Sequence, residues 1–350
     1  MLISVYVPSV VTAVVTAVVT AVVTAVVTVL APRLARRLTP RPAAWALVCA
    51  ALVTAGGWTG SLTLLAFAGI AQVPQVAAEG HWSVSALRAQ DPVYVAVAAA
   101  SAVVLATSVV SLIVSALRQV RQVVRARREC AGLPGDTELA VLDEDAPLAF
   151  ALPGAPGRIV VSRGMLRCLG DDERAALLAH ERAHLRGRHY LFLSLWRLTA
   201  ALNPLLRPLA GTGAFVLERR ADEEAAAQVG DRTVVARVVG RAALASAGVS
   251  RPAHLAATGG EVPQRVRALL APPPARRSLP LLAGAVLLTV CCASLANAAS
   301  DSDHMVDSAK RAQCAAPVES AGPPPMGDHR RGPGFCWAPH DRGRRREHRS

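Results

Sequence analysis

The residues best placed to do chemistry are His180, Glu181 and His184, which form the pentapeptide HERAH in a segment predicted to be helical. Residues i and i+4 lie one above the other on a helix face, so two imidazoles at this spacing can bind one tetrahedral Zn²⁺. Glu181 then lies beside the metal, where its carboxylate can take a proton from the attacking water and pass it to the leaving amine. The pattern predicts a zinc metallopeptidase. A surface helix with two solvated histidines is the alternative interpretation.

The residues before the motif predict the helix that must carry it. Asp171 and Asp172 follow a glycine and precede Glu173, which indicates a helix start with acidic residues in its first turn. The apolar run from Ala175 to Ala179 then forms the body of the helix. The motif is therefore expected in mid-helix.

Two histidines and a base leave zinc short of one protein ligand, and the segment FVLERRADEEAAAQ offers carboxylates for it. Glu218 and Asp222 are again four residues apart, so one can bind zinc while the other holds a ligating imidazole from behind. A solvated charged helix has the same composition. Glu223 and Glu224 are expected at the surface, although the spacing also allows these acids to exchange roles.

These motifs, with IVVSRGML before the first helix and LNPLL between the two, give a chain that resembles the integral membrane zinc metallopeptidases of the BlaR/MecR receptor type. It is also similar to their relatives, the HtpX and CAAX prenyl proteases. The resemblance covers roughly residues 141–230. It implies that His180, His184 and Glu218 bind Zn²⁺, that Glu181 is the catalytic base and that Asp222 supports a ligand. The receptor type is favoured because about thirty residues separate the two zinc helices, fewer than two membrane spans would need.

The composition predicts a membrane protein, since 52% of residues are hydrophobic and only 18% are charged. Four apolar stretches are long enough to cross a bilayer, namely residues 10–30, 43–73, 93–117 and 279–299. The expected fold is mainly α: four transmembrane helices, with an α+β gluzincin-type zinc metallopeptidase domain inserted between spans three and four. This divides the chain into a membrane domain (1–117), a cytoplasmic peptidase domain (118–278), the fourth span (279–299) and a disordered basic tail outside the cytoplasm (300–350).

The placement of arginines predicts the orientation, because short basic loops stay in the cytoplasm. Arginines cluster between spans one and two and after span three, whereas Arg88 is the only basic residue of the loop formed by residues 74–92. The protein is therefore expected to be a multi-pass protein of a bacterial plasma membrane, with its catalytic domain in the cytoplasm. The net charge of +13 resides at span borders and in the tail. This pattern favours the lipid bilayer as a partner, and nucleic acid is not expected as one.

The first span is a VVTA repeat with a threonine at every fourth residue from Thr12 to Thr28. In lipid, such a stripe of small residues either packs against another helix or is a low-complexity segment of no specific role. The chain has seven cysteines without a C-x-x-C pair, and Cys314 and Cys336 in the tail are candidates for a disulfide.

Three short strands are expected before the zinc helix, at Glu138–Leu142, Leu148–Leu152 and Arg158–Ser162. Residues 149–152 either pair with the substrate backbone or form part of a structural hairpin. After the zinc helix, His189 and Tyr190 are either donors to the developing oxyanion or interfacial residues. The apolar segment Tyr190–Leu202 is expected to rest on, or dip into, the inner leaflet.

Two functions fit these residues. The first is an endopeptidase that hydrolyses cytoplasmic or membrane-proximal proteins, with a protein or peptide as its substrate. The second is a non-catalytic signalling or scaffold protein with a structural zinc site, which would not require Glu181. The residues after Ala299 contain no S-x-x-K motif, so antibiotic sensing by acylation is not expected. A transcriptional repressor as substrate is an analogy with the receptor type only.

Overall fold

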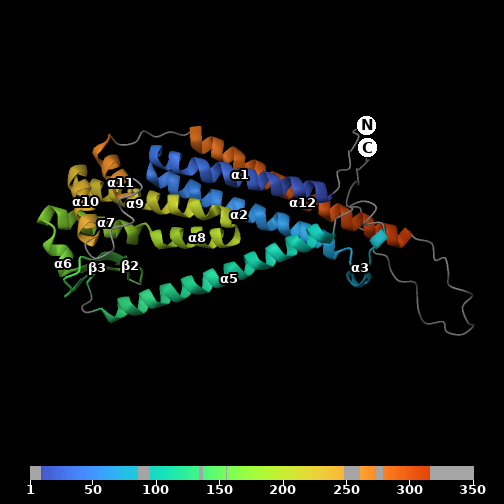
Figure 1. Cartoon of the computed structure of the whole chain (residues 1–350), viewed down its shortest axis with the longest axis horizontal. Coiled ribbons are helices and arrows are strands. Elements are labelled where there is room, and N and C mark those ends of the chain that lie inside the picture. The colour runs from blue at the N-terminus through green and yellow to red at the C-terminus, as the bar shows by residue number, and fades with distance from the viewer. Residues whose placement is uncertain are drawn as a thin grey trace, which may run out of the picture.

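The computed structural model describes residues 9–85, 95–133, 137–154, 156–247, 261–272 and 279–315. The molecule is elongated, with long helices along its length and a small sheet with short helices at one end (Figure 1). The described part thus separates into a bundle of long helices and a compact end that carries the HERAH helix.

Four long helices contain stretches that are long and apolar enough to cross a membrane. They are α1 (Ser9–Arg37), α2 (Pro40–Ile70), α5 (Val95–Gly132) and α12 (Leu279–Ala315), and a short helix, α3 (Pro74–Gly80), follows α2. The helix α12 continues through residues 300–315, which corrects the prediction that a disordered tail begins at residue 300. Cys336 lies outside the described residues, so the proposed disulfide stays a prediction.

The VVTA repeat forms a packing face, which confirms one of the two interpretations. Thr16, Thr20 and Thr24 are buried, whereas Val14, Val15, Val18 and Val22 of the repeat are exposed. Thr16 Oγ1 lies 2.8 Å from Ser294 Oγ of α12, and Thr24 Oγ1 donates to the carbonyl oxygen of Thr20 at 2.7 Å. The threonines therefore place small polar groups between helices, where each finds a hydrogen-bond partner away from lipid.

The sheet contains β1 (Leu139–Leu142), β2 (Ala149–Leu152) and β3 (Arg158–Ser162), which confirms the three predicted strands to within one residue. Their order is β1-β3-β2, with β3 parallel to β1 and antiparallel to β2. All five residues of β3 are buried, as expected for a central strand with both faces covered. The strand β2 consequently lies at one edge of this sheet.

The remaining elements are α6 (Arg163–Arg167), α7 (Asp171–Arg186), α8 (His189–Leu202), η1 (Pro204–Leu206), α9 (Arg207–Val229), α10 (Arg232–Ala247) and α11 (Glu261–Leu270). The helices α8 and α9 form a hairpin that lies beside α2 and α5 (Figure 1). Asn203 starts its turn, since its Oδ1 accepts a hydrogen bond from Leu205 N at 3.1 Å. Gly213 permits the close approach of the two helices, because a Cβ there would lie 2.5 Å from the Trp196 ring.

The helix α9 belongs to two hydrophobic cores. Its first half, with Leu209, Phe215 and Val216, packs against α1, α2 and α8, whereas Ala225 and Ala226 pack with the sheet, α7, α10 and α11. The buried guanidinium of Arg219 donates to the carbonyl oxygens of Ala35 and Leu38 at the end of α1. Cations are favourable at a helix C-terminus, so this contact fixes α9 to the first span.

Candidate active site

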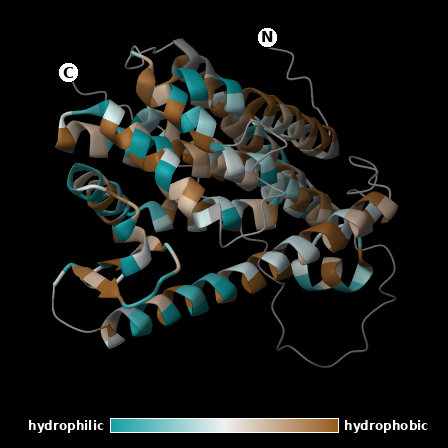
Figure 2. Ribbon diagram, turned by 60° about the vertical axis from the view of Figure 1, so that its left-hand side comes forward, coloured by the Kyte–Doolittle hydropathy of each residue, from teal (hydrophilic) through white to brown (hydrophobic). Residues whose placement is uncertain are grey.

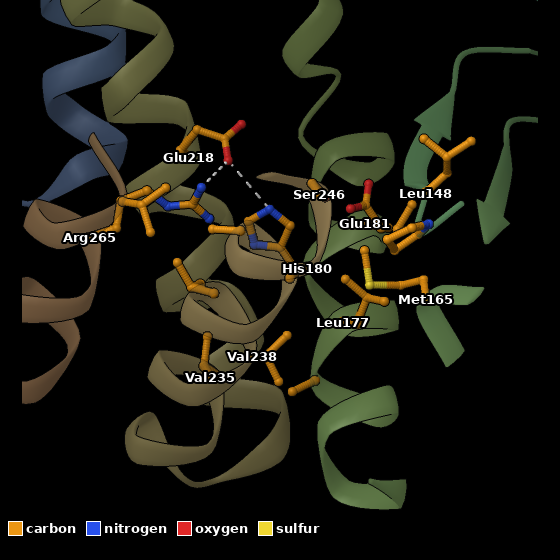
Figure 3. Close-up of a pocket in the computed structure, with 17 residues that line it drawn as sticks. Leu148, Met165, Leu177, His180, Glu181, Glu218, Val235, Val238, Ser246 and Arg265 are labelled. Atoms are coloured by element: carbon orange, nitrogen blue, oxygen red, sulfur yellow. Dashed lines mark ion pairs between the residues drawn. The ribbon is translucent and has the colours of Figure 1, made fainter. Parts of the chain in front are cut away.

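The helix α7 places the HERAH motif as predicted. It begins at Asp171 with three acidic residues in its first turn, and Glu173 Oε2 accepts a hydrogen bond from Gly170 N at 3.0 Å. Negative charge in the first turn complements the helix dipole. Its His180 and Glu181 are both buried, and Glu218 of α9 lies next to His180 (Figure 3). The motif therefore lies inside the protein, which excludes a solvated surface helix.

Three side chains converge at a point between α7 and α9. His180 Nε2 lies 3.1 Å from His184 Nε2, and the carboxylate oxygens of Glu218 lie 3.6 Å and 3.4 Å from these two nitrogens. A tetrahedral zinc ion with bonds of about 2.0–2.1 Å holds its ligand atoms about 3.3 Å apart. The separations and the donor types therefore fit zinc, with two imidazoles and one carboxylate as the protein ligands.

Asp222 lies behind His180 and not at the metal position. Its Oδ1 is 3.1 Å from His180 Nδ1, a hydrogen-bond distance with an approach direction that is not ideal. A carboxylate in this position fixes the tautomer in which Nε2 is free to bind metal. Glu223 pairs with Arg232, and Glu224 pairs with Arg220 at 2.8 Å. Glu218 is therefore the one acid of the four in the ligand position.

Arg265 of α11 is a site residue that the sequence did not reveal. Its Nε and Nη2 donate to the two carboxylate oxygens of Asp222 at 2.8 Å and 2.7 Å, and its Nη1 lies 2.8 Å from Glu218 Oε2 (Figure 3). A planar guanidinium can hold one carboxylate with two parallel bonds and still reach a second one. One arginine thus orients both acids. A pair of buried carboxylates requires a cation, but the spacing of residues does not say which arginine supplies it.

His189 has a position that neither sequence interpretation described. It is buried, and its Nδ1 lies 2.9 Å from Nδ1 of His184. It therefore contacts the side of His184 opposite to Glu218 and holds that ring in place. Tyr190 lines a neighbouring cavity together with His184 and Glu181.

The charges of this cluster prepare it for a cation. Burial would raise the pKa of Glu218, but the contacts with His180 and Arg265 lower it to about 2, so Glu218 is an anion. Burial lowers the pKa of His184 to about 4, which leaves its nitrogen lone pair free. Burial would lower the pKa of His180 as well, yet Asp222 and Glu218 raise it to about 9. Zinc binding therefore has to displace one proton from His180.

Glu181 lies between the metal position and the edge strand β2. Burial raises the pKa of its carboxyl group, partly offset by the charge of His180 and by a hydrogen bond from the backbone of Ala151. A raised pKa makes a carboxylate a better proton acceptor near neutral pH. Glu181 thus combines a raised pKa with a position beside His180, as a general base requires.

Two cavities meet at His180, Glu181 and Glu218. The first has a volume of about 330 Å³ and extends under Ala149 between apolar side chains that include Met165, Leu177, Val235 and Val238 (Figure 3). The second has a volume of about 350 Å³ and continues past Phe150 and Ala151 toward His184 and Tyr190. Because Ala149 lines both, β2 runs from one cavity to the other beside Glu181.

Residues 115–272 match the family model described as Peptidase family M48. This segment includes all five predicted site residues and Arg265. No solved structure gives a significant match.

Several curated proteins match shorter parts of the chain. The mitochondrial metalloendopeptidase OMA1 of Schizosaccharomyces pombe is 49% identical over 53 residues, which is 15% of this chain and 15% of that protein. The protease HtpX homolog of Gemmatimonas aurantiaca is 41% identical over 66 residues, 18% of this chain and 23% of the relative. The protease HtpX homolog of Syntrophobacter fumaroxidans is 34% identical over 99 residues, 28% of this chain and 35% of the relative. The chain thus spans about a third or less of the length of these relatives.

The matches and the four long apolar helices support a membrane metallopeptidase of the M48 type. They agree with the resemblance to HtpX proteases, while the BlaR/MecR type receives no support from them. A transcriptional repressor as substrate is likewise unsupported.

Proposed function

We propose that the protein is a membrane-embedded zinc endopeptidase that hydrolyses peptide bonds of cytoplasmic or membrane-proximal proteins. The observation that carries this proposal is the convergence of His180, His184 and Glu218 at zinc-ligand separations, with Glu181 buried beside them. A structural zinc site has four protein ligands and needs no base. Three ligands and an adjacent carboxylate are the arrangement of a catalytic site.

Zinc, when bound, supplies a Lewis acid that polarises the scissile carbonyl and acidifies the attacking water. Glu181 accepts the proton of that water as its oxygen attacks the carbonyl carbon. The same carboxyl group then gives the proton to the amide nitrogen as the C–N bond breaks. Asp222, His189 and Arg265 do not react and hold the ligands in position.

The substrate backbone pairs with the free edge of β2 in this proposal, and antiparallel pairing is the more common and slightly more stable arrangement. The strand runs from the apolar cavity at Ala149 toward the cavity at Tyr190. An antiparallel substrate runs in the opposite sense, so the residue after the scissile bond lies over the apolar cavity. We therefore expect cleavage before aliphatic residues.

The catalytic end lies in the cytoplasm in this proposal. Its support is the set of arginines that follow the apolar part of α5, from Arg118 to Arg128, and those between α1 and α2. A reporter fused to the C-terminus should then be active only outside the cytoplasm. Activity inside would reverse this orientation.

The function is tested with detergent-solubilised protein and casein as substrate. Glu181→Gln should retain zinc and lose at least about a hundredfold in cleavage rate, because it removes the proton acceptor and leaves the ligands. His184→Ala should lose both zinc and cleavage. Equally slow cleavage by wild type and both variants would instead indicate a scaffold protein with a structural zinc site.

A further inference from the structure

A separate cavity of about 510 Å³ lies between α5, α8 and the start of α9, and shares no lining residue with the two cavities beside Glu181. Its charged side chains are Arg118 of α5, Arg197 of α8 and Arg207 of α9. We call it the arginine cavity. Arg118 on α5 and the α8–α9 hairpin with Arg197 and Arg207 thus place three arginines around the same space.

The arginine cavity has no internal counter-charge. Within the described ranges, no Asp or Glu lines it, and none of its three arginines forms an ion pair. Several arginines of the peptidase end, in contrast, pair with carboxylates, as Arg232 does with Glu223 and Arg265 with Asp222. Arg207 also lies in the first turn of α9, where the helix dipole disfavours a cation. An anion bound between the three groups would remove both unfavourable effects.

A buried amide adds a second requirement on the ligand. Gln119 lines the arginine cavity and is 8% exposed, and its Nε2 donates to Ser115 Oγ at 3.4 Å. Its Oε1 is buried and has no hydrogen-bond partner within the described part of the chain. An unsatisfied buried acceptor costs about 1–3 kcal/mol, so a ligand hydroxyl that donates to it would be favoured. The cavity therefore suits a molecule with both a phosphate and a hydroxyl group.

The surroundings indicate that this molecule is a lipid. Arg118 directly follows the apolar part of α5, at the level where a membrane span meets water. On the same helix, Val110, Ile113 and Leu117 are exposed and apolar. Figure 2 shows hydrophobic residues (brown) along α5 giving way to hydrophilic ones (teal) toward the sheet. A headgroup in the cavity could thus extend its acyl chains along α5, which a free phosphate cannot exploit.

We propose that the arginine cavity binds the headgroup of an anionic glycerophospholipid that carries a free hydroxyl, such as phosphatidylglycerol. The arginines hold the phosphate by charge-assisted hydrogen bonds, and Gln119 accepts a bond from the hydroxyl. The bound lipid ties α5 to the α8–α9 hairpin, whose second helix carries Glu218. This site does not depend on the proposed peptidase activity.

The test uses the full-length protein, purified in a neutral detergent and titrated with dioctanoyl phosphatidylglycerol. Native mass spectrometry counts bound lipid, and the thermal unfolding midpoint gives an independent measure of binding. Wild type should bind phosphatidylglycerol at least about tenfold more tightly than phosphatidylcholine. The zwitterionic headgroup has no net negative charge and no hydroxyl, so it forms weaker contacts with the arginines and none with Gln119. Phosphatidylmethanol, which has the same single negative charge but no headgroup hydroxyl, should bind a few-fold more weakly than phosphatidylglycerol.

The triple variant Arg118→Gln/Arg197→Gln/Arg207→Gln should lose the preference for phosphatidylglycerol. The matched control is Arg121→Gln, which removes an exposed arginine of α5 that does not line the cavity and should retain the preference. Equal loss in the control would show a general surface-charge effect and overturn the site. Retained preference in the triple variant would do the same.

Inorganic phosphate distinguishes the two sources of the anion. At about 10 mM it should not displace the lipid, because it lacks the apolar contacts along α5. Displacement at that concentration would overturn the lipid assignment.

If the triple variant does not accumulate, the single variant Arg118→Gln replaces it in the test, because Arg118 is exposed on α5 and its loss should not prevent folding. The preference of this variant for phosphatidylglycerol should be at least about threefold lower than that of wild type. An unchanged preference would again overturn the proposal.

Discussion

Two groups of charged side chains lie on either end of the α8–α9 hairpin and differ in their charge balance. Around His180, the carboxylates of Glu218 and Asp222 contact both imidazole and guanidinium groups at 2.7–3.6 Å. In the arginine cavity, three arginines line one space without a carboxylate among the described lining residues. The first cluster can hold its own geometry before any ligand binds, whereas an external anion would supply the negative charge that the described lining of the second does not contain.

Burial explains why the two differ in this way. The His180 cluster is nine-tenths buried at His180 and Glu181, where an unpaired charge would be expensive, so acids and bases occur together. The three arginines of the cavity are exposed, so water solvates them while the ligand is absent. Side chains that are already held in place suit a catalytic site. A solvated cationic cavity suits a lipid that binds from the bilayer and returns to it.

The largest expected effect is a loss of stability when the cation of the His180 cluster is removed. Arg265→Met leaves the carboxylates of Asp222 and Glu218 without their cation, and removing one partner of a buried pair costs about 3–5 kcal/mol. The metal-free protein should lose that much free energy of unfolding, measured by denaturant unfolding in detergent with tryptophan fluorescence. Arg197→Gln should change it by less than about 0.5 kcal/mol without anionic lipid, because no carboxylate is left unpaired.

A matched control for Arg265 exists on the same helix. Arg267 is exposed in the last turn of α11, and Arg267→Met should change the free energy of unfolding by less than about 0.5 kcal/mol. Similar losses for the two variants would contradict the view that Arg265 balances the site acids.

A smaller effect is expected behind the metal ligand. Asp222→Asn removes the negative charge that orients His180, and loss of such a partner lowers metal affinity about 10–100-fold. Competition with a zinc chelator measures the affinity. Glu224→Gln, on the same helix but paired with Arg220, should leave it unchanged. Wild-type zinc affinity in Asp222→Asn would show that the contact with His180 is incidental.

The smallest expected effect concerns peptide specificity, which should depend on the shape of the apolar cavity and not on the charges of the arginine cavity. Ala242 lines the apolar cavity beside Glu181, and Ala242→Phe should fill it and reduce kcat/KM about tenfold for peptides with leucine after the scissile bond. Peptides with alanine there should be cleaved nearly as before, and retention of phosphatidylglycerol should not change. Leu244→Phe, exposed on the same helix, is the control. An identical loss of kcat/KM for both peptides would show that the substrate leucine does not bind in this cavity. Mass spectrometry of the products locates the cleaved bond.

Local patterns predicted much of the fold. Apolar length gave the four long helices, and alternation between Pro and Gly breaks gave the three strands. The extent of α12 was wrong, because residues 300–315 are polar enough to suggest disorder and yet continue a helix that is already nucleated. The packing face of the VVTA repeat was one of two open interpretations, since a repeat does not state which helix will lie against it.

In the candidate site, the i, i+4 spacing was enough to predict that His180 and His184 lie together, because helix geometry alone puts them on one face. The same spacing could not separate Glu218 from Asp222, and the packing of α7 on α9 places Glu218 near Nε2 of both histidines and Asp222 near Nδ1 of His180. Neither His189 nor Arg265 stands at a recognisable motif spacing from the HERAH residues in the sequence. Their roles depend on where α8 and α11 cross the zinc helices.

The sequence by itself predicted the membrane character, the proposed zinc pair and the helix that carries it, since these follow from composition and from contacts within one helix. The tertiary structure decided which acid faces the metal, which arginine neutralises it and which three arginines share a cavity. Those choices join residues up to 89 positions apart in the chain, as Arg118 and Arg207 are. Only the packing of helices on one another brings such residues together, and no local pattern encodes that packing.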